Sequence, residues 1–127
     1  MTKKIVVAED DKDILFVLKF ILNEAGYEVE PMADGKSIIS RNQDWPDLFI
    51  LDNNMPTISG LALCKYLKLK QETKDIPIVM ISAYHNMRKK ALQAGVADFI
   101  EKPFKTEQIL NVIRTNVTHE NVSGSRL

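Results

Sequence analysis

Short apolar runs alternate with longer amphipathic stretches along almost the whole chain. Apolar runs rich in β-branched residues predict buried strands, and three of them cover residues 5–8, 48–51 and 76–81. Weaker runs at 27–30 and 98–100 predict two further strands. In between, apolar residues recur at three- and four-residue steps, which predicts helices. These helices cover residues 14–25, 34–41, 61–69, 86–94 and 109–117.

Glycine, proline and aspartate punctuate this pattern. Gly26 and Gly95 directly follow two of the helical stretches and are expected to end them. Pro77 suits the first positions of a strand, where a missing N–H is tolerated. Pro103 is expected to stop the last strand, and Asp34 is placed at or near the N-cap of the short helix.

Five strands that alternate with five helices predict an α/β fold, a doubly wound parallel sheet with helices on both faces. The sequence shows no internal repeat and no linker to a second domain. The expected organisation is one domain over residues 1–118, followed by a flexible polar tail over residues 119–127. In such sheets, ligands bind beyond the carboxyl ends of the strands.

Composition limits the classes of function. The chain has 127 residues, which is enough for one domain with a core, and 17 basic residues balance 17 acidic ones. This balance gives no global electrostatic reason to expect nucleic acid or an acidic membrane as a partner. The single cysteine, Cys64, excludes an intrachain disulfide and a cysteine-based metal site. No apolar stretch has the length of a membrane span or signal peptide, so a soluble, cytoplasmic protein is expected.

Polar side chains follow four of the five predicted strands. Because the carboxyl ends of parallel strands meet at one edge of a sheet, these groups are expected to converge. Several carboxylates in one small pocket would repel each other and raise each other's pKa values. A hard cation such as Mg²⁺, which prefers oxygen ligands, would neutralise them. The groups are Glu9-Asp10-Asp11, Asp52-Asn53-Asn54, Ser82-Ala83 and Glu101-Lys102-Pro103.

This set of side chains suits phosphoryl transfer. Asp10, Asp52 and a backbone carbonyl are the candidate Mg²⁺ ligands, with Glu9 reaching the metal through water. Lys102 and Ser82 would each stabilise a phosphoryl oxygen. Asp52 would be the nucleophile, as carboxylates are in aspartyl-phosphate enzymes. Taken singly, each residue has a simpler explanation as a cap, a turn or a loop residue. Their joint position at the ends of four strands favours the chemical interpretation.

These motifs resemble the receiver domain of two-component response regulators, and the match runs from residue 3 to about residue 117. The most specific segment is Asp-x-x-Met-Pro beginning at Asp52, with Gly60 at the family spacing. The acidic pair Glu9 and Asp10, and the segment 99–104, also match. The resemblance implies a flavodoxin-like sheet with the strand order 2-1-3-4-5.

The resemblance also implies the role of each acidic residue. Asp52 would be phosphorylated by a sensor histidine kinase or a phosphotransfer protein. Mg²⁺ would be held by Glu9, Asp10, Asp52 and the carbonyl of Asn54. The protein would assist only its own phosphorylation and dephosphorylation, and would not be an enzyme in any other sense.

A second set of residues would form the switch. By resemblance, the Ser82 hydroxyl moves toward the phosphoryl group and the ring of Phe99 turns inward. Phe99 stands where tyrosine is commoner, so it lacks a hydroxyl for an outward contact. The surface over residues 85–117 would then change shape and be read by an unknown downstream protein. The Lys102–Pro103 peptide bond is expected to be cis.

Two residues are expected to set the lifetime of the phosphorylated state. Tyr84 lies two residues after Ser82, near the expected path of the hydrolytic water, and its bulky ring would shield the phosphoryl group. Asn54 lies two residues after Asp52 and would tune the lifetime together with Tyr84.

Two other functions fit parts of the pattern. A metal-dependent phosphatase would also use an aspartate nucleophile at a strand end. In the haloacid-dehalogenase group a second aspartate acts as general acid, but here that position is Asn54, which does not exchange protons near neutral pH. A protein-interaction module that has lost phosphorylation would not need the residues for phosphoryl transfer, yet all of them are present in this sequence. The sequence leaves open whether the protein is an output regulator or a phosphorelay intermediate.

The basic cluster Arg88-Lys89-Lys90 lies on a predicted helix. No output domain follows it, so a solvated face or a protein-docking patch is expected there, and direct DNA binding is not. No membrane partner is expected either. The resemblance allows a homodimer to form on phosphorylation through the surface over residues 85–117, a point that the sequence leaves open.

Overall fold

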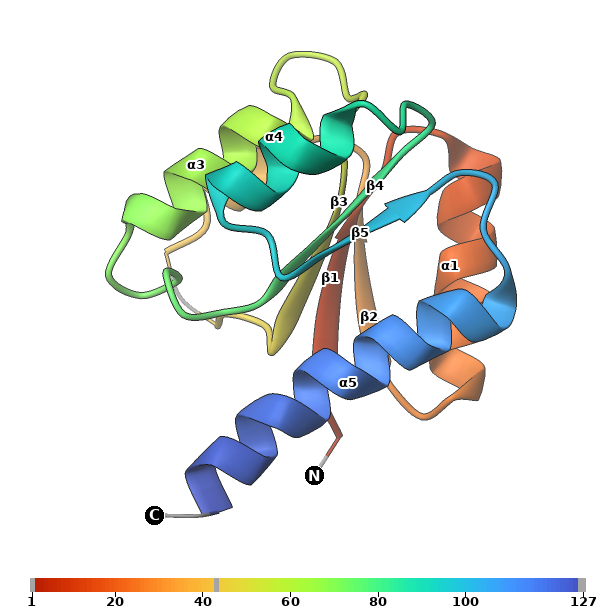
Figure 1. Ribbon diagram of the computed structural model, residues 1–127, viewed down its shortest axis with the longest axis vertical. Coiled ribbons are helices and arrows are strands. Elements are labelled where there is room, and N and C mark those ends of the chain that lie inside the picture. The colour runs from red at the N-terminus through yellow and green to blue at the C-terminus, as the bar shows by residue number, and fades with distance from the viewer. Residues whose placement is uncertain (1, 43, 126–127) are drawn as a thin grey trace.

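A computed structural model describes residues 2–42 and 44–125, with side chains up to residue 117. Five strands form one parallel sheet in the order β2-β1-β3-β4-β5 (Figure 1). The predicted α/β fold and its strand order are therefore confirmed. The strands are β1 (Lys4–Ala8), β2 (Glu28–Met32), β3 (Leu48–Asp52), β4 (Ile78–Ser82) and β5 (Asp98–Glu101).

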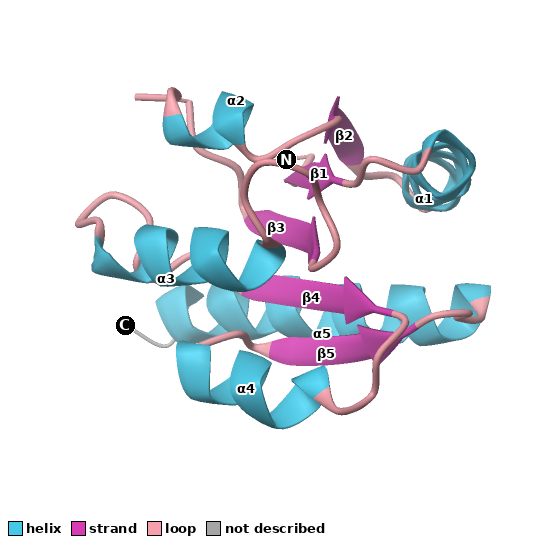
Figure 2. Cartoon of the chain, turned by 90° about the horizontal axis from the view of Figure 1, so that it is seen from above, coloured by secondary structure: helices cyan, strands magenta, loops and turns pink. Residues whose placement is uncertain are grey.

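Helices cover both faces of the sheet, as Figures 1 and 2 show. They are α1 (Lys12–Glu24), α2 (Lys36–Ile39), α3 (Gly60–Leu69), α4 (Met87–Ala94) and α5 (Thr106–Ser125). The helices α1 and α5 lie on one face, and α2, α3 and α4 lie on the other. Every residue of β3 and β4 is buried, because each of these central strands packs against helices on both sides. This explains why their sequences are continuous apolar runs.

Several element boundaries differ from the sequence prediction: β4 begins after Pro77 and not at residue 76, and the limits of β2 and α2 also change. The strand β2 continues through Pro31 to Met32, although the prediction ended at residue 30. Because β2 is an edge strand, the missing N–H of Pro31 costs no bond within the sheet. The helix α2 is shorter than predicted and Gly35 is its N-cap, while the Asp34 carboxylate accepts a hydrogen bond from the N–H of Lys36 at 3.0 Å.

The helix α5 is longer than predicted. Its apolar spacing ends at Val117, but the helix continues to Ser125, so the predicted end at residue 117 is wrong. Polar residues without a proline continue a helical hydrogen-bond ladder without presenting an apolar face, and apolar periodicity does not detect them. The domain boundary at residue 118 and the flexibility of residues 119–127 stay predictions, and residues 126–127 lie outside the described part of the chain.

Within the described ranges, none of the helices combines the length and the apolar character that crossing a lipid bilayer requires. Cys64 is a free thiol, as the sequence predicted, and it is buried. Burial raises the pKa of its thiol, which keeps it in the unreactive protonated form.

An ion pair fixes the edge strand β2 to the segment after α2. Two nitrogen atoms of the Arg41 guanidinium lie 2.8 and 3.0 Å from the two carboxylate oxygens of Glu30, and Nζ of Lys4 lies 3.1 Å from Oε1. The Arg41 guanidinium, with help from Lys4, lowers the pKa of Glu30 from 4.5 to about 2. Glu30 therefore stabilises the folded chain above pH 4.5, and this contribution is lost as the pH falls toward 2.

We expect Glu30→Gln to lower the free energy of unfolding by about 1 kcal/mol at neutral pH. The effect is modest because the Glu30 side chain is 37% exposed and solvent screens its charge. Urea unfolding at several pH values should show the difference from wild type shrinking as the pH falls below 4.5. Glu28→Gln, an exposed position on the same strand, is the matched control. A difference that stays constant with pH would contradict this account.

Candidate functional site

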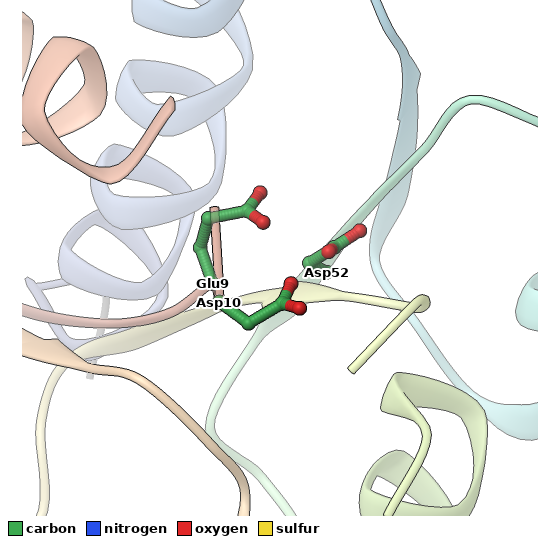
Figure 3. Close-up of side chains that lie close together, drawn as sticks. All are labelled: Glu9, Asp10 and Asp52. Atoms are coloured by element: carbon green, nitrogen blue, oxygen red, sulfur yellow. The ribbon is translucent and has the colours of Figure 1, made fainter. Parts of the chain in front are cut away.

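Three carboxylates meet at the carboxyl edge of the sheet (Figure 3). Glu9 and Asp10 follow β1, and Asp52 is the last residue of β3. Glu9 and Asp52 are buried and Asp10 is exposed. One carboxylate oxygen from each residue lies within 4.8 Å of the other two. The predicted convergence of the first and third strand ends is therefore confirmed.

The acidic triplet after β1 divides into three separate roles. Oε2 of Glu9 accepts a hydrogen bond from the N–H of Asp11 at 3.1 Å, which orients the Glu9 carboxylate. Asp11 is the N-cap of α1, and its Oδ1 accepts from the N–H groups of Asp13 and Ile14 at 2.9 and 3.2 Å. Capping therefore occupies Asp11 and leaves Asp10 for the carboxylate cluster.

Lys102 joins the end of β5 to this cluster. Its Nζ lies 3.1 Å from Oε1 of Glu9 and 3.1 Å from Oδ1 of Asp52. Its backbone N–H donates to the carbonyl of Ser82 at 2.9 Å, which links it to the end of β4. The Lys102–Pro103 peptide bond is cis, as the resemblance implied. The ends of four strands therefore meet, and Lys102 places its ammonium between the two buried carboxylates.

Burial and mutual repulsion shape the charges of this cluster. Burial, with a further contribution from the neighbouring Asp52, raises the pKa of Glu9 to about 7. Burial also disfavours the charge on Lys102, but the carboxylates of Asp52 and Glu9 outweigh it and raise the pKa of Lys102. The ammonium is thus held in its charged form, while one more positive charge would stabilise the ionised form of Glu9.

The donor set fits a hard divalent cation. It consists of carboxylate oxygens only, which Mg²⁺ and Ca²⁺ prefer over nitrogen and sulfur ligands. Oε1 of Glu9 is buried, and within the described residues it has the ion-pair contact with Lys102 but no well-aligned hydrogen bond. Three carboxylates share a single ammonium, so the cluster keeps an excess of negative charge. Glu9, Asp10 and Asp52 thus form a candidate metal site.

The loop between β3 and α3 folds back onto Asp52. The N–H of Asn54 donates to Oδ1 of Asp52 at 3.3 Å. Asn53 closes the loop, because its carbonyl accepts from the N–H of Gly60 at 3.1 Å and its Oδ1 accepts from the N–H of Leu61 at 3.0 Å. Sequence reasoning did not predict this role. An asparagine after a strand indicates local bonding to the backbone, but it does not reveal a partner eight residues away.

The predicted switch residues lie beside the cluster. Oγ of Ser82 is buried and accepts a hydrogen bond from the N–H of Tyr84 at 3.1 Å. The ring of Phe99 is buried, and the guanidinium of Arg88 lies over it, 5.1 Å from the ring centroid. The sequence did not predict this cation–π contact. Movement of Ser82 and Phe99, and the influence of Asn54 and Tyr84 on lifetime, stay predictions.

An apolar groove begins next to Lys102. A hollow of about 390 Å³ lies between α1 and the segment after β5, and Ile14, Val17 and Phe104 are among its lining residues. A second hollow, also of about 390 Å³, continues between α1 and α5 and shares Val17. A protein that brings a reactive group to Asp52 from this side would therefore contact α1.

Known proteins resemble this chain in sequence and in structure. Residues 5–114 match the family model of the response regulator receiver domain. The phosphate regulon transcriptional regulatory protein PhoB of Escherichia coli is 34% identical over 117 residues, which is 90% of this chain and 51% of PhoB. The chain thus spans about half the length of such relatives.

Solved structures agree. The chemotaxis response regulator CheY4 of Vibrio cholerae is 26% identical with a TM-score of 0.85, over 91% of this chain and 99% of that one. The receiver domain of the sensor histidine kinase PA1611 of Pseudomonas aeruginosa shares the fold, with a TM-score of 0.84 and 24% identity over 93% and 99% of the two chains. That structure holds a magnesium ion coordinated in its active site cleft.

Proposed function

The chain belongs to the response regulator receiver family, and from this premise we propose that it is a phosphorylation-driven switch. Asp52 accepts a phosphoryl group from a histidine kinase in a Mg²⁺-dependent reaction, and a downstream protein reads the resulting shape change. One observation carries the proposal. The ammonium of Lys102 lies 3.1 Å from both buried carboxylates, Glu9 and Asp52, at the edge where four strands end.

The chemical step is a transfer between two nucleophiles. A carboxylate oxygen of Asp52 attacks the phosphorus of a phosphohistidine. The new P–O bond forms while the P–N bond breaks, and the histidine nitrogen leaves with the electron pair of that bond. The N–H of Asn54 and the ammonium of Lys102 orient the Asp52 carboxylate through Oδ1. Lys102 then stabilises the negative charge that spreads over the phosphoryl oxygens in the transition state.

Glu9, Asp10 and Asp52, with the carbonyl of Asn54, would hold Mg²⁺, which when bound would offset the excess negative charge and bind a phosphoryl oxygen. The all-oxygen donor set supports this ion. The magnesium in the PA1611 receiver domain is a further support. The chain's own part is to hold the buried carboxylates of Glu9 and Asp52 close to the ammonium of Lys102.

The switch would use Ser82 and Phe99. Oγ of Ser82 would give up the hydrogen bond that it accepts from the N–H of Tyr84, and its hydroxyl would instead donate a hydrogen bond to a phosphoryl oxygen. This new bond can form only in the phosphorylated state. Phe99 is buried in this structure, and Arg88 of α4 lies over its ring. A movement of Ser82 would reach α4 through the short segment that joins Ser82 to this helix, and would change the contact between Arg88 and Phe99. A partner protein would read the surface of α4, β5 and α5. The chain would catalyse only its own phosphorylation and dephosphorylation.

The proposal is tested by incubating the protein with Mg²⁺ and acetyl phosphate and measuring its intact mass. We expect one phosphate-sized increase that disappears in Asp52→Asn and when a chelator removes Mg²⁺. An increase that persists in Asp52→Asn would refute the assignment of the phosphorylated residue. Turnover of a generic phosphatase substrate would favour the phosphatase. No increase and no Mg²⁺ binding would favour the interaction module.

Kinase docking should depend on the apolar groove of α1. Phe16 and Phe20 on this helix are 70% and 58% exposed, and Phe20 lines the groove. We expect Phe20→Ser to slow transfer from a phosphorylated histidine kinase about tenfold, because it removes an aromatic side chain that the kinase would bury in the complex. Labelling by acetyl phosphate should not change, since this donor needs no protein interface. The control is Leu69→Ser, an exposed position on α3. Equal slowing with both donors would contradict docking on α1.

Tyr84 should protect the phosphorylated state. Its backbone N–H is fixed to Ser82 at 3.1 Å and its side chain is exposed, so the ring lies at the rim of the site. We expect Tyr84→Ala to accelerate dephosphorylation by a factor of a few, on the order of 1 kcal/mol in activation free energy. Tyr84→Phe keeps the ring and should retain the wild-type rate. An unchanged or slower rate in Tyr84→Ala, followed by mass spectrometry after removal of the donor, would disprove shielding.

A further inference from the structure

A hollow of about 430 Å³ lies between α3 and α4, on the face of the sheet opposite α1 and α5. Leu61 and Lys65 line it from α3, and Lys90, Gln93 and Ala94 line it from α4. The two helices lie side by side in both views (Figures 1 and 2). The hollow therefore combines two ammonium groups with aliphatic side chains from two adjacent helices.

The segments that carry these helices are basic without any acidic residue. Residues 53–71 and 83–97 contain six of the 17 basic residues and no Asp or Glu, in a chain whose formal net charge is zero. Such a separation of charge gives one face of the molecule a positive potential. The basic residues are Lys65, Lys68, Lys70, Arg88, Lys89 and Lys90.

Some of these charges already have partners. Nζ of Lys68 donates to the carbonyls of Lys74 and Ile76 at 3.0 and 3.2 Å, so this lysine stabilises the turn after α3. The guanidinium of Arg88 lies over the ring of Phe99. These two cations already have structural contacts, and neither is among the residues that line the hollow.

Lys65 and Lys90 differ from them. Within the residues that the structure describes, neither forms an ion pair, whereas Lys70 lies 4.0 Å from Glu72. Leu61, Lys65 and Leu69 lie at four-residue steps on one stripe of α3, and Leu69 is 88% exposed at its end. The hollow and this stripe thus offer unpaired positive charge next to uncovered apolar surface.

We propose that this hollow docks an acidic segment of a partner protein. Its carboxylates would pair with Lys65 and Lys90, and an apolar side chain would pack against Leu61 and Ala94. Charge complementarity identifies the occupant, because a protein segment supplies both carboxylates and apolar side chains. Nucleic acid binding typically uses about six to ten phosphate contacts, and polybasic membrane sites use about four to eight Lys or Arg residues. Lys65 and Lys90 fall short of both numbers, and Lys89, which also has no ion pair within the described residues, brings the unpaired lysines of these segments only to three.

This docking surface overlaps at α4 with the surface that phosphorylation is proposed to change. Leu61 and Lys65 belong to α3, which lies outside the proposed switch surface of α4, β5 and α5. The observations that carry the inference are the lining and the charges of the unphosphorylated chain, so it does not rest on the phosphorylation of Asp52. Its test uses the unphosphorylated chain, so failure of one proposal leaves the other in place.

The test is an NMR titration of the isotope-labelled chain with a peptide of alternating Glu and Leu residues at low salt. We expect the largest amide shifts at the lining residues of α3 and α4. Lys65→Glu and Lys90→Glu should each weaken binding about tenfold. Lys19→Glu, an exposed position on α1, should change the affinity less than about twofold. Lys65→Gln and Lys90→Gln provide milder variants, and thermal unfolding checks that each variant is folded.

Four results would overturn the inference. Equal loss of affinity in Lys19→Glu would show that the peptide follows the general charge of the protein. Largest shifts on α1 or α5 would place the binding elsewhere. Lys65- and Lys90-dependent binding of phosphatidylserine vesicles or duplex DNA, without binding of the peptide, would assign this face to lipid or nucleic acid. Equal binding of a Gln–Leu peptide would remove the role of the carboxylates and refute the proposal as well.

Discussion

Replacing Lys102 by alanine is expected to slow the phosphorylation of Asp52 by acetyl phosphate about a hundredfold, the usual cost of losing one preorganised donor to a transition-state oxygen. Nζ of Lys102 lies 3.1 Å from Oδ1 of Asp52, within reach of a group attached to that carboxylate. Phosphoryl transfer depends mainly on such positioning and charge stabilisation, since the transferred group spreads its charge over three equatorial oxygens. The initial rate is measured by intact mass at saturating Mg²⁺.

Two variants make this prediction specific. Lys105→Ala removes an exposed lysine three residues farther along the chain and should leave the rate unchanged. Lys102→Arg keeps the positive charge in a planar group of different shape, so its rate should lie between wild type and Lys102→Ala. If Lys102→Ala folds normally and is phosphorylated at the wild-type rate, Lys102 serves only to balance Glu9 and Asp52 in the resting protein.

The parts of the site that depend on strand ends could be predicted from the sequence. The strands β3 and β4 are buried on both faces, so their continuous apolar runs are visible without any knowledge of the tertiary fold. Once these strands are parallel, the residues after them share one edge, and this places Asp52 near Glu9 and Lys102.

The sequence could not show which of several neighbouring residues of the same type makes which contact. Asp10 and Asp11 are chemically identical, and only the start of α1 decides that Asp11 caps the helix. The same limit applies to the basic cluster over residues 88–90. Successive residues on a helix point about 100° apart, because a turn takes about 3.6 residues. Arg88 consequently contacts Phe99, while Lys90 lines the hollow beside α3.

Contacts between segments that lie apart in the chain could not be predicted from the sequence either. The bond from the N–H of Leu61 to the side chain of Asn53 depends on how the loop after β3 returns to the sheet. The spacing from Asp52 to Gly60 resembles the family pattern, but spacing alone does not say why glycine is needed. In the structure, glycine is needed at position 60 because a larger residue would have no room beside the backbone of Asp52 and Asn53, and not because the backbone there adopts a conformation that only glycine tolerates.

A Cβ atom at position 60 would lie 2.6 Å from the carbonyl oxygen of Asp52, 2.9 Å from Cα of Asn53 and 3.0 Å from the carbonyl carbon of Asp52. All three are backbone atoms, so no side chain can rotate away to make room. We expect Gly60→Ala to lower the free energy of unfolding by about 3 kcal/mol, the upper range for overpacking. Phosphorylation should slow too, because the displaced segment carries Asp52 itself. Urea unfolding and acetyl phosphate labelling measure the two effects.

Gly26→Ala is the matched control, because it separates lack of room from backbone strain. Gly26 has a φ of +98° and a Cβ atom there would meet nothing within 4 Å, so alanine should cost only about 1 kcal/mol from the left-handed backbone. Gly26 also lies after α1, away from the carboxyl edge of the sheet, and its variant should be phosphorylated at the wild-type rate. If Gly60→Ala were as mild as Gly26→Ala in both measurements, the loop would be able to move aside. The close approach of Gly60 to Asp52 would then not be what holds the phosphorylation site in place.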